Sequence, residues 1–317
     1  YKTYLIMKSL LNILFIFLVT QSLTAQLPGS GISLESNVLD GVYIQEHIPT
    51  KRVVSYIHLR EADVMWSKRI WRVLDLKEKK NHKLYYPLEP QNDRISLFEV
   101  MKYGALDEGS ITLYDLGGIE LDDKFRFPVR PNNGNANDPE FKRKLETMFG
   151  QETQVDSIEI VDGVEGPAID DDGENIKITV VEEYTSRDIV RYVLKEDWFF
   201  DKQRSMLDVR IIGISPVVYS RNPETLEIDG LKNLFWLYFP ECRYVFQNFF
   251  VYNPDNDAQR MSFDDLFWKR DFSSYVQKES NVFDRAVSPN WDGLDALLQS
   301  EKVRNEIFTF EHDLWHF

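Results

Sequence analysis

The sequence has few of the residue types that carry covalent, metal or nucleotide chemistry. Cys242 is the only cysteine in 317 residues, so an intrachain disulfide and a cysteine-based zinc site are both excluded. It lies in a run rich in apolar residues, and we expect a buried structural thiol rather than a nucleophile. The sequence also lacks a GxSxG nucleophile elbow and the glycine spacing of phosphate loops. None of these patterns therefore predicts a catalytic residue or a cofactor.

Metal-binding patterns are equally sparse. The five histidines form no HExxH motif, and His312 and His316, which have helical spacing, are better explained by packing or solvent exposure at the chain end. The acidic run at residues 169–176 resembles part of a calcium loop, but Ala168 and Thr179 stand where the terminal ligands belong. A solvated turn is the favoured interpretation, and an irregular site made only of oxygen ligands remains the alternative.

Long apolar runs are absent apart from one near the N-terminus. Residues 10–19 (LLNILFIFLV) are too short to span a bilayer, which requires about 20 residues, and they are typical of a secretory signal peptide. We assign residues 1–25 to this signal, with 1–6 as an upstream extension and cleavage after Ala25. An uncleaved membrane anchor is the alternative. The polar residues 26–50 are expected to form an arm that docks on a neighbour.

The formal net charge is -15, which argues against general binding to nucleic acid. The charge is nevertheless segregated, with a basic stretch at residues 66–83 and an acidic stretch at 152–183. Such surfaces could pair between neighbouring copies, head to tail, although both could equally be solvated faces. The residues that we predict at this interface are Lys68, Arg69, Arg72, Lys79, Lys80, Asp170, Asp171 and Asp172.

Hydrophobic periodicity predicts an α+β fold with a mainly antiparallel sheet and amphipathic helices. Helices are expected at 61–75, 138–150, 186–197, 262–279 and 294–308, and strands at 110–114, 176–184, 205–219, 233–240 and 242–252. The segment RISLFEV at 94–100 returns as RMSFDDL at 260–266, each with a serine placed to cap a helix. This repetition suggests two degenerate α+β units, at 51–150 and 176–317, separated by an acidic loop at 151–175.

Three aromatic-rich blocks resemble a known family. They are YIHLREADVMWSKRIWRVLDLKEKKNHKLYYPLEP at 56–90, DWFFDKQRSMLDVRIIGISPV at 197–217, and the block from LFWLYFPECRYVF to VFDR at 234–285. In this order they resemble the gliding motility protein GldN, called PorN in non-gliding relatives, of the type IX secretion system of Bacteroidota. The resemblance covers essentially the whole chain after the signal peptide.

The resemblance implies a non-enzymatic structural protein of the periplasm, at the inner face of the outer membrane. It implies a ring built with an outer-membrane lipoprotein, GldK or PorK, which contacts the shaft of an inner-membrane motor, GldM or PorM. Neighbouring copies in the ring are expected partners. The family offers no catalytic residues to carry over. The alternative from a different class is an exported glycan-binding or glycoside-hydrolysing domain, which would require two carboxylates about 5 to 9 Å apart in a pocket.

Overall fold

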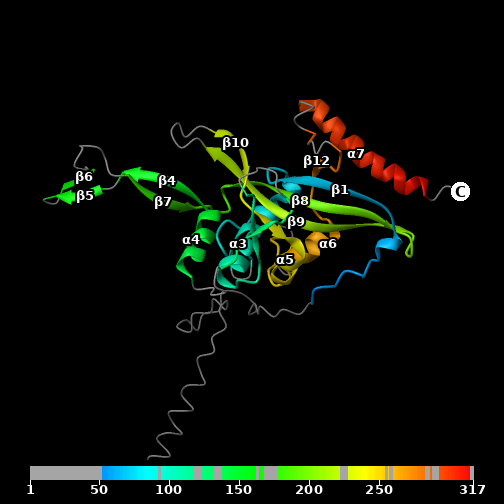
Figure 1. Cartoon of the computed structure of the whole chain (residues 1–317), viewed down its shortest axis with the longest axis horizontal. Helices are drawn as coiled ribbons and strands as arrows, with labels where there is room; N and C mark the ends of the chain where they lie inside the picture. Colours follow the sequence, from blue (N-terminus) through cyan, green and yellow to red (C-terminus); the bar gives the residue numbers. More distant parts are fainter. Residues whose placement is uncertain are drawn as a thin grey trace, which may run out of the picture. The chain divides into compact units, whose positions relative to one another are not determined.

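A mainly antiparallel sheet forms the centre of the molecule, seen in the computed structural model (Figure 1). Its 8 strands run in the order β12-β1-β8-β9-β11-β2-β3, with β10 paired to β9. This arrangement confirms the predicted α+β class. The structure describes residues 52–91, 94–117, 123–131, 138–156, 158–161, 164–167, 177–221, 228–253, 256, 260–282, 286–287 and 293–314.

The sheet strands differ greatly in length, and β1, β8 and β9 are the longest of those described. Their bounds are β1 (Val64–Asp75), β2 (Leu113–Asp115), β3 (Phe127–Pro128), β8 (Ile189–Asp201), β9 (Met206–Arg221), β10 (Ile228–Asn233), β11 (Trp236–Tyr238) and β12 (Tyr275–Glu279). The α-helices are α2 (His82–Tyr85), α3 (Leu97–Lys102), α4 (Pro139–Met148), α5 (Phe239–Phe246), α6 (Phe263–Lys269) and α7 (Gly293–Asp313).

Strand β1 corrects the prediction of a helix at 61–75, of which only a single 3-10 turn (Glu61–Asp63) is helical. The three- and four-residue spacing of apolar side chains is helical, but the strand buries alternate residues on both faces. Leu74 contacts the main core and Ile70 a small core with α7, whereas Trp71 and Val73 contact a third set of residues. Because β8 and β12 pair with β1 on its two sides, the sheet overrides the local pattern.

Strand β8 was likewise mistaken for a helix. Ile189, Val190, Tyr192 and Val193 are all buried, since this central strand is covered on both faces. The opposite error occurs at 242–252, predicted as a strand, where α5 ends at Phe246. Pro240 in its first turn is a helix-start signal that the interpretation missed.

The capping predictions are confirmed. The side chain of Ser96 accepts a hydrogen bond from Glu99 N at the start of α3, and Ser262 accepts one from Asp265 N at the start of α6. Asp138 caps α4 in the same way. Helix α6 is shorter than predicted, because Arg270 adopts a left-handed conformation that ends it, and the chain then enters β12.

The segment predicted as an acidic loop contains strands where it is described. β4 (Gly150–Asp156) pairs with β7 (Lys177–Glu183), and β5 (Ile158–Val161) pairs with β6 (Val164–Pro167), forming two small sheets (Figure 1). The proposed units 51–150 and 176–317 both contribute strands to the large sheet. The division into two units stays a prediction.

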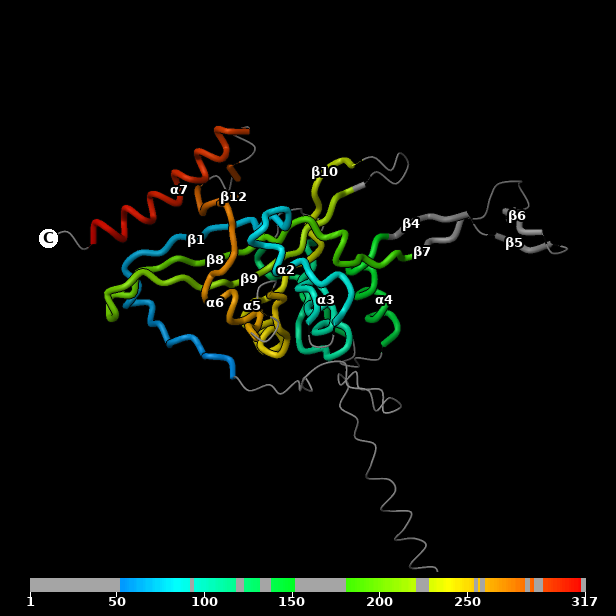
Figure 2. Tube along the Cα trace, turned by 180° about the vertical axis from the view of Figure 1, so that it is seen from behind, coloured from blue at the N-terminus to red at the C-terminus, as the bar shows by residue number. Residues whose placement is uncertain are grey.

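The main core fills the space between the sheet and helices α3, α5 and α6, which lie on the same side of β8 and β9 in Figures 1 and 2. Leucine and phenylalanine are its commonest residues, and Phe246 packs against Phe239, Phe263 and Phe267. A separate small core joins α7 to β1 and β12 through Val303 and Ile307. Helix α7 is therefore attached at the edge of the sheet, since β12 is its terminal strand.

Candidate interaction surface

The predicted basic interface residues on β1 have partners within the chain. Lys68 Nζ lies 2.6 Å from Glu279 Oε2, and Arg69 donates two hydrogen bonds to Asp197, at 2.6 and 2.7 Å. The Arg72 side chain is buried. These contacts neutralise the three cations locally, and their role between subunits stays a prediction.

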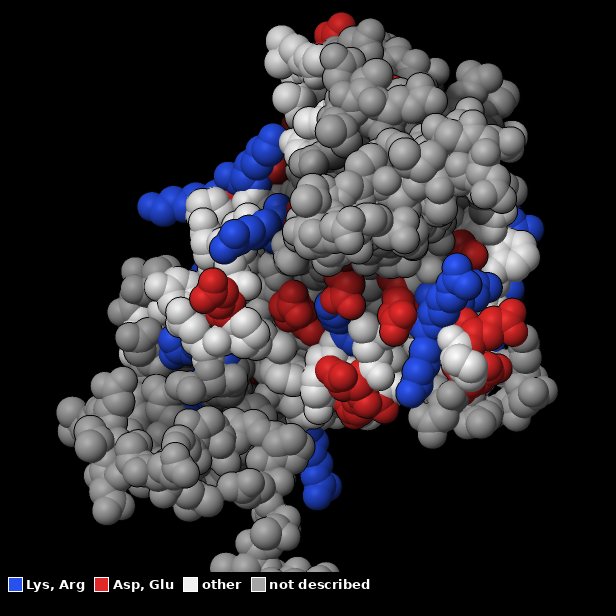
Figure 3. All heavy atoms as spheres, turned by 90° about the vertical axis from the view of Figure 1, so that its left-hand side faces the viewer, with Lys and Arg blue, Asp and Glu red and all other residues white. Residues whose placement is uncertain are grey.

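Lys79 and Lys80 lie beyond β1 and are exposed. Lys80 Nζ is 3.5 Å from Asp271, whose other oxygen accepts a hydrogen bond from Lys83 at 2.8 Å. The hydrogen bond from Lys83 and the nearby lysine charges hold the pKa of Asp271 below its ordinary value. The acidic residues Asp170, Asp171 and Asp172 lie outside the described residues. On the face shown in Figure 3, acidic and basic side chains of the described residues lie side by side rather than in fields of one sign.

A fully buried carboxylate organises the junction of β1, β8 and α6. Glu196 Oε1 lies 2.9 Å from Arg270 Nη2, and Glu196 Oε2 accepts a hydrogen bond from Trp198 Nε1 at 3.0 Å. Arg72 Nε is 3.2 Å from Oε2, an ion-pair contact outside hydrogen-bond geometry. Burial lowers the pKa of Arg72, and the charge of Glu196 opposes that shift.

The two arginines also pack on the same indole ring. The guanidinium carbons of Arg72 and Arg270 lie 5.4 and 5.3 Å from the Trp198 ring centroid. We call Glu196, Arg72, Arg270 and Trp198 the closed arginine cluster. It connects β1 and β8, which are distant from each other in the sequence, and it ties both strands to Arg270 at the end of α6. Its role is therefore to fix the fold.

A second arrangement of the same chemistry lies at the surface. Arg243 on α5 and Asp264 on α6 form a buried bidentate ion pair, with hydrogen bonds of 2.8 and 3.2 Å. The Arg243 guanidinium lies 4.5 Å from the ring centroid of Tyr56, which also stacks on Trp268 at 5.8 Å. Tyr56 belongs to residues 52–60, an irregular segment before β1 that we call the strap.

Arg210 on β9 completes this arrangement. It lies 5.2 Å from the Tyr56 ring, and its Nη2 donates a hydrogen bond of 2.5 Å to the carbonyl of Ile57. Burial raises the pKa of Tyr56, while the charge of Arg243 opposes that rise. A hollow of about 280 Å³ borders the site. We call Arg210, Arg243, Asp264 and Trp268 the tyrosine socket.

The local sequence patterns do not predict the socket. Asp264 stands in the first turn of α6, where a carboxylate interacts favourably with the helix dipole, and it is also buried against Arg243. Tyr56 meets its partners only in the folded chain, because α5 and α6 follow much later in the sequence. Its aromatic character was the one available signal, and a lone tyrosine is more often explained by core packing.

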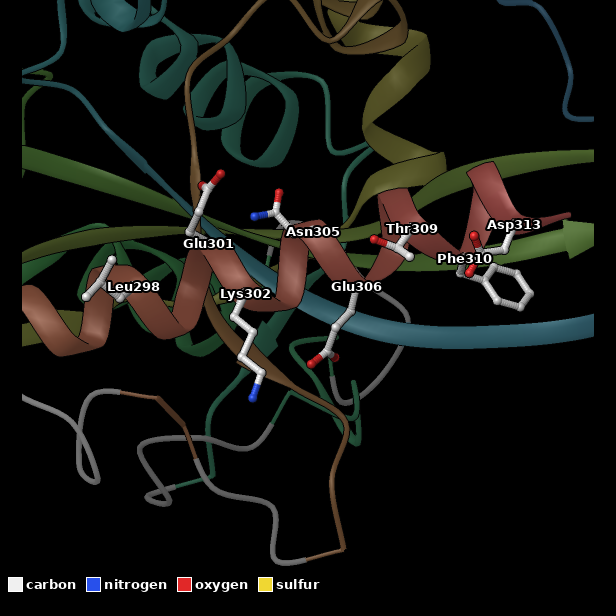
Figure 4. Close-up of a pocket in the computed structure, with 8 residues that line it drawn as sticks. All are labelled: Leu298, Glu301, Lys302, Asn305, Glu306, Thr309, Phe310 and Asp313. Carbon is white, nitrogen blue, oxygen red and sulfur yellow. The ribbon is translucent and has the colours of Figure 1, made fainter. Parts of the chain in front are cut away.

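Helix α7 presents a second apolar surface to solvent. Ser300, Val303 and Ile307 face the body of the molecule, whereas Leu294, Leu297, Leu298 and Phe308 are exposed. A shallow hollow of about 640 Å³ runs along the helix, and Figure 4 shows that all eight lining side chains come from α7. A hollow formed by one helix encloses no reaction site, but it suits contact with another protein.

The group around Asp123 is structural in character. Trp71 Nε1 donates a hydrogen bond to Asp123 Oδ2 at 2.5 Å, and Lys195 Nζ donates one to the Asp123 carbonyl at 2.6 Å. Burial lowers the pKa of Lys195, and Asp123 opposes this shift. A hollow of about 770 Å³ lies beside Trp71, Asp123 and Lys278.

Single residues with possible chemistry are also accounted for. Cys242 is buried in α5, as predicted, and burial raises the pKa of its thiol. His312 is exposed on α7, and His316 lies outside the described residues. Across the part of the chain that the structure describes, no three His, Cys, Asp or Glu side chains gather as metal ligands. No helix in the same part is long and apolar enough to cross a bilayer.

Comparison with protein families decides the identity. Residues 59–316 match the family of the gliding motility associated protein GldN. The chain belongs to the GldN family. A comparison with curated proteins finds no match. Membership links the chain to gliding motility and type IX secretion, as a structural component of envelope-associated machinery that associates with other components.

The residues that match the GldN family include all four residues of the tyrosine socket and the whole of helix α7. Tyr56 lies just before the first matched residue, and the signal-like run lies further upstream. The surfaces described above therefore belong to a structural component of the gliding and secretion machinery.

Proposed function

We propose that this chain is a non-enzymatic periplasmic subunit of the type IX secretion machinery. It carries a cleaved signal peptide at residues 1–25 and forms a ring with an outer-membrane lipoprotein, GldK or PorK, at the inner face of the outer membrane. The ring contacts the motor shaft protein, GldM or PorM, and supports secretion and, in gliding species, cell movement.

The family match is the observation that carries this proposal. Two features of the described surface support it. Exposed aromatic and aliphatic side chains gather at the tyrosine socket and along α7, and such patches are typical of protein interfaces. The buried ionisable groups are engaged by partners within the chain at the closed arginine cluster and at Asp123, which suits a structural role.

Co-expression of the mature chain, starting at Gln26, with its lipoprotein partner tests the proposal. We expect electron microscopy to show rings or arcs, and light scattering to give a mass well above that of a one-to-one complex. A one-to-one complex at every ionic strength would contradict the assembly. N-terminal sequencing of the protein from the cell envelope checks the signal peptide, with Gln26 as the expected first residue.

A salt series tests the predicted basic interface. Because Lys68, Arg69 and Arg72 are paired within the chain, the exposed Lys79 is the sharper position. Lys79→Glu should weaken assembly more at low than at high salt, since exposed charges are screened over about 10 Å at 0.1 M. Lys142→Glu, an exposed lysine on α4 that lies in neither described surface, is the matched control. Equal salt profiles for both variants would remove Lys79 from the interface.

A further inference from the structure

The strap is held in its socket by few contacts. It belongs to no strand, and its hydrogen bonds among the described residues run from Arg210 Nη2 to the Ile57 carbonyl and, within the adjoining turn, from Asp63 N to the Arg60 carbonyl. The Tyr56 ring adds contacts with Trp268 and the guanidiniums of Arg243 and Arg210, and Val53 and Leu59 are partly buried. Release of the strap at Tyr56 therefore requires loss of one ring contact site and one hydrogen bond to the body.

The central ion pair of the socket is made without the strap. Arg243 on α5 and Asp264 on α6 form two hydrogen bonds that fix the guanidinium facing the Tyr56 ring. Arg210 is held in β9, and its guanidinium carbon lies 5.2 Å from the ring centroid of Phe199 in the paired strand β8. The receptor is thus preorganised for a tyrosine side chain.

Docking within one chain leaves apolar surface exposed around the socket. Val54 and Ile57 on the strap, Trp268 in the socket and Tyr244 on α5 are between 53% and 68% exposed. Met206, which borders the hollow, is exposed as well. Tyrosine, tryptophan, methionine and arginine are the residue types enriched at protein interfaces.

The connection between strap and sheet permits a change of direction. Glu61–Asp63 is a single 3-10 turn with no buried residue, and one backbone hydrogen bond of 2.9 Å, from Lys202 N to the Asp63 carbonyl, joins its end to the body. Beyond it, β1 is fixed between β8 and β12. The turn is therefore the natural hinge.

From these observations we infer that the strap of one copy seats in the tyrosine socket of the neighbouring copy in the assembled protein. Every contact that Tyr56 makes within one chain can be made identically between two chains, which is why such exchanges have a low energetic cost. Bringing two copies together would additionally cover the exposed apolar side chains of the strap and socket. The inference rests on the proposed assembly of neighbouring copies.

The exchange would also set the geometry of assembly. Strap and socket are different surfaces, so the contact is heterologous, and a repeated heterologous contact closes into a ring or extends into a filament. Each copy donates one strap and accepts another. The proposed ring and the strap exchange are therefore compatible, while a symmetric dimer would exchange two straps and stop.

Crosslinking between differently tagged copies tests the exchange. One copy carries Ile57→Cys and the other Met206→Cys, both at exposed positions that border the hollow. The copies are co-expressed with the lipoprotein partner and treated with a short bis-maleimide. Cys242 is kept, because it is buried and its pKa is raised, and the unmodified chain measures any background.

We expect a crosslinked product that carries both tags. Adding Tyr56→Ala to the strap copy should reduce it at least tenfold, and Tyr56→Phe should reduce it less than twofold. Val282→Cys, an exposed position that does not border the hollow, replaces Met206→Cys as the control and should give no such product.

The outcomes separate this inference from the proposed function. Rings without a two-tag product overturn the exchange and leave the proposed assembly intact. Neither rings nor a two-tag product would overturn both. A two-tag product that Tyr56→Ala leaves unchanged would also overturn the assignment, because the tyrosine would then not be the anchor.

Discussion

Two groups of side chains in this molecule combine an arginine stacked on an aromatic ring with a buried carboxylate. They differ in which part of the chain covers the charged side chains. In the closed arginine cluster, Glu196 is 0% exposed and all its partners belong to the folded body. In the tyrosine socket, the ion pair of Arg243 and Asp264 is buried, but the ring that covers it comes from the strap.

The difference shows how one kind of contact can stabilise a fold or hold a segment. Removing one partner of a buried charge leaves the other without compensation, so the closed arginine cluster should be sensitive to change. A cation–π contact at a partly exposed site contributes only about 0.5 to 1 kcal/mol, so the strap should detach without unfolding the body. Four measurements can test this difference.

The largest effect is expected at the closed arginine cluster. Glu196→Gln leaves Arg72 buried without its counter-charge, and the free energy of unfolding should fall by about 3 to 5 kcal/mol in urea denaturation. Asp197→Asn, the neighbouring carboxylate paired with the exposed Arg69, is the control and should cost less than about 1 kcal/mol. Equal losses would mean that burial does not distinguish the two ion pairs.

Helix α7 offers a comparison of a buried side chain with an exposed one at two adjacent residues. Ile307 is 4% exposed and faces β12, whereas Phe308 is 66% exposed. Ile307→Ala should destabilise the protein by about 2 to 4 kcal/mol. Phe308→Ala should change the unfolding free energy by less than about 0.5 kcal/mol. Thermal and urea unfolding would measure both, and a large loss for Phe308→Ala would show that α7 packs differently.

A substitution in the strap should have a smaller effect on the free energy of unfolding and a larger effect on the local resistance to proteolysis. Tyr56→Ala removes a stacking contact worth about 0.5 to 1.5 kcal/mol, so the unfolding free energy should fall by about 1 kcal/mol. Limited proteolysis of residues 52–60 should accelerate severalfold, while alkylation of buried Cys242 should hardly change. Rapid alkylation of Cys242 would instead show that the strap supports the core.

The smallest effect is a pH dependence at the end of α6. Lys83 holds the pKa of Asp271 below its ordinary value, so this contact stabilises the fold above the unfolded pKa of Asp271 and is lost as the pH falls through the folded one. Lys83→Met should therefore be less stable than the parent at neutral pH, and the difference should vanish in acid. Urea unfolding at several pH values checks this, and a constant difference would exclude Asp271 as the cause.

Local signals predicted part of the fold well. Asp138, Ser96 and Ser262 mark helix starts because capping depends only on residues nearby in sequence. Strands β1 and β8 were misassigned because their apolar residues lie on both faces, which hides the two-residue period of a strand. Tertiary pairing, and not local preference, decides their conformation.

The candidate surface was harder to predict for a related reason. Arg72 was assigned to a surface patch because arginine is usually exposed, but its strand position places it against Glu196. Tyr56 and Trp268 lie far apart in the sequence, and only the fold stacks them. The sequence alone indicates the family of the protein, whereas the surfaces of the folded chain depend on long-range contacts.

The position of β1 has a consequence for how the molecule is made. Among the described strands it pairs only with β8 and β12, both of which belong to the later half of the polypeptide. Until those residues have been synthesised, β1 has no strand to join, and its backbone N–H and C=O groups stay bonded to water. The sheet can therefore be completed only when β12, near the end of the chain, has been made, and this delay would suit the export of an unfolded precursor that is proposed above.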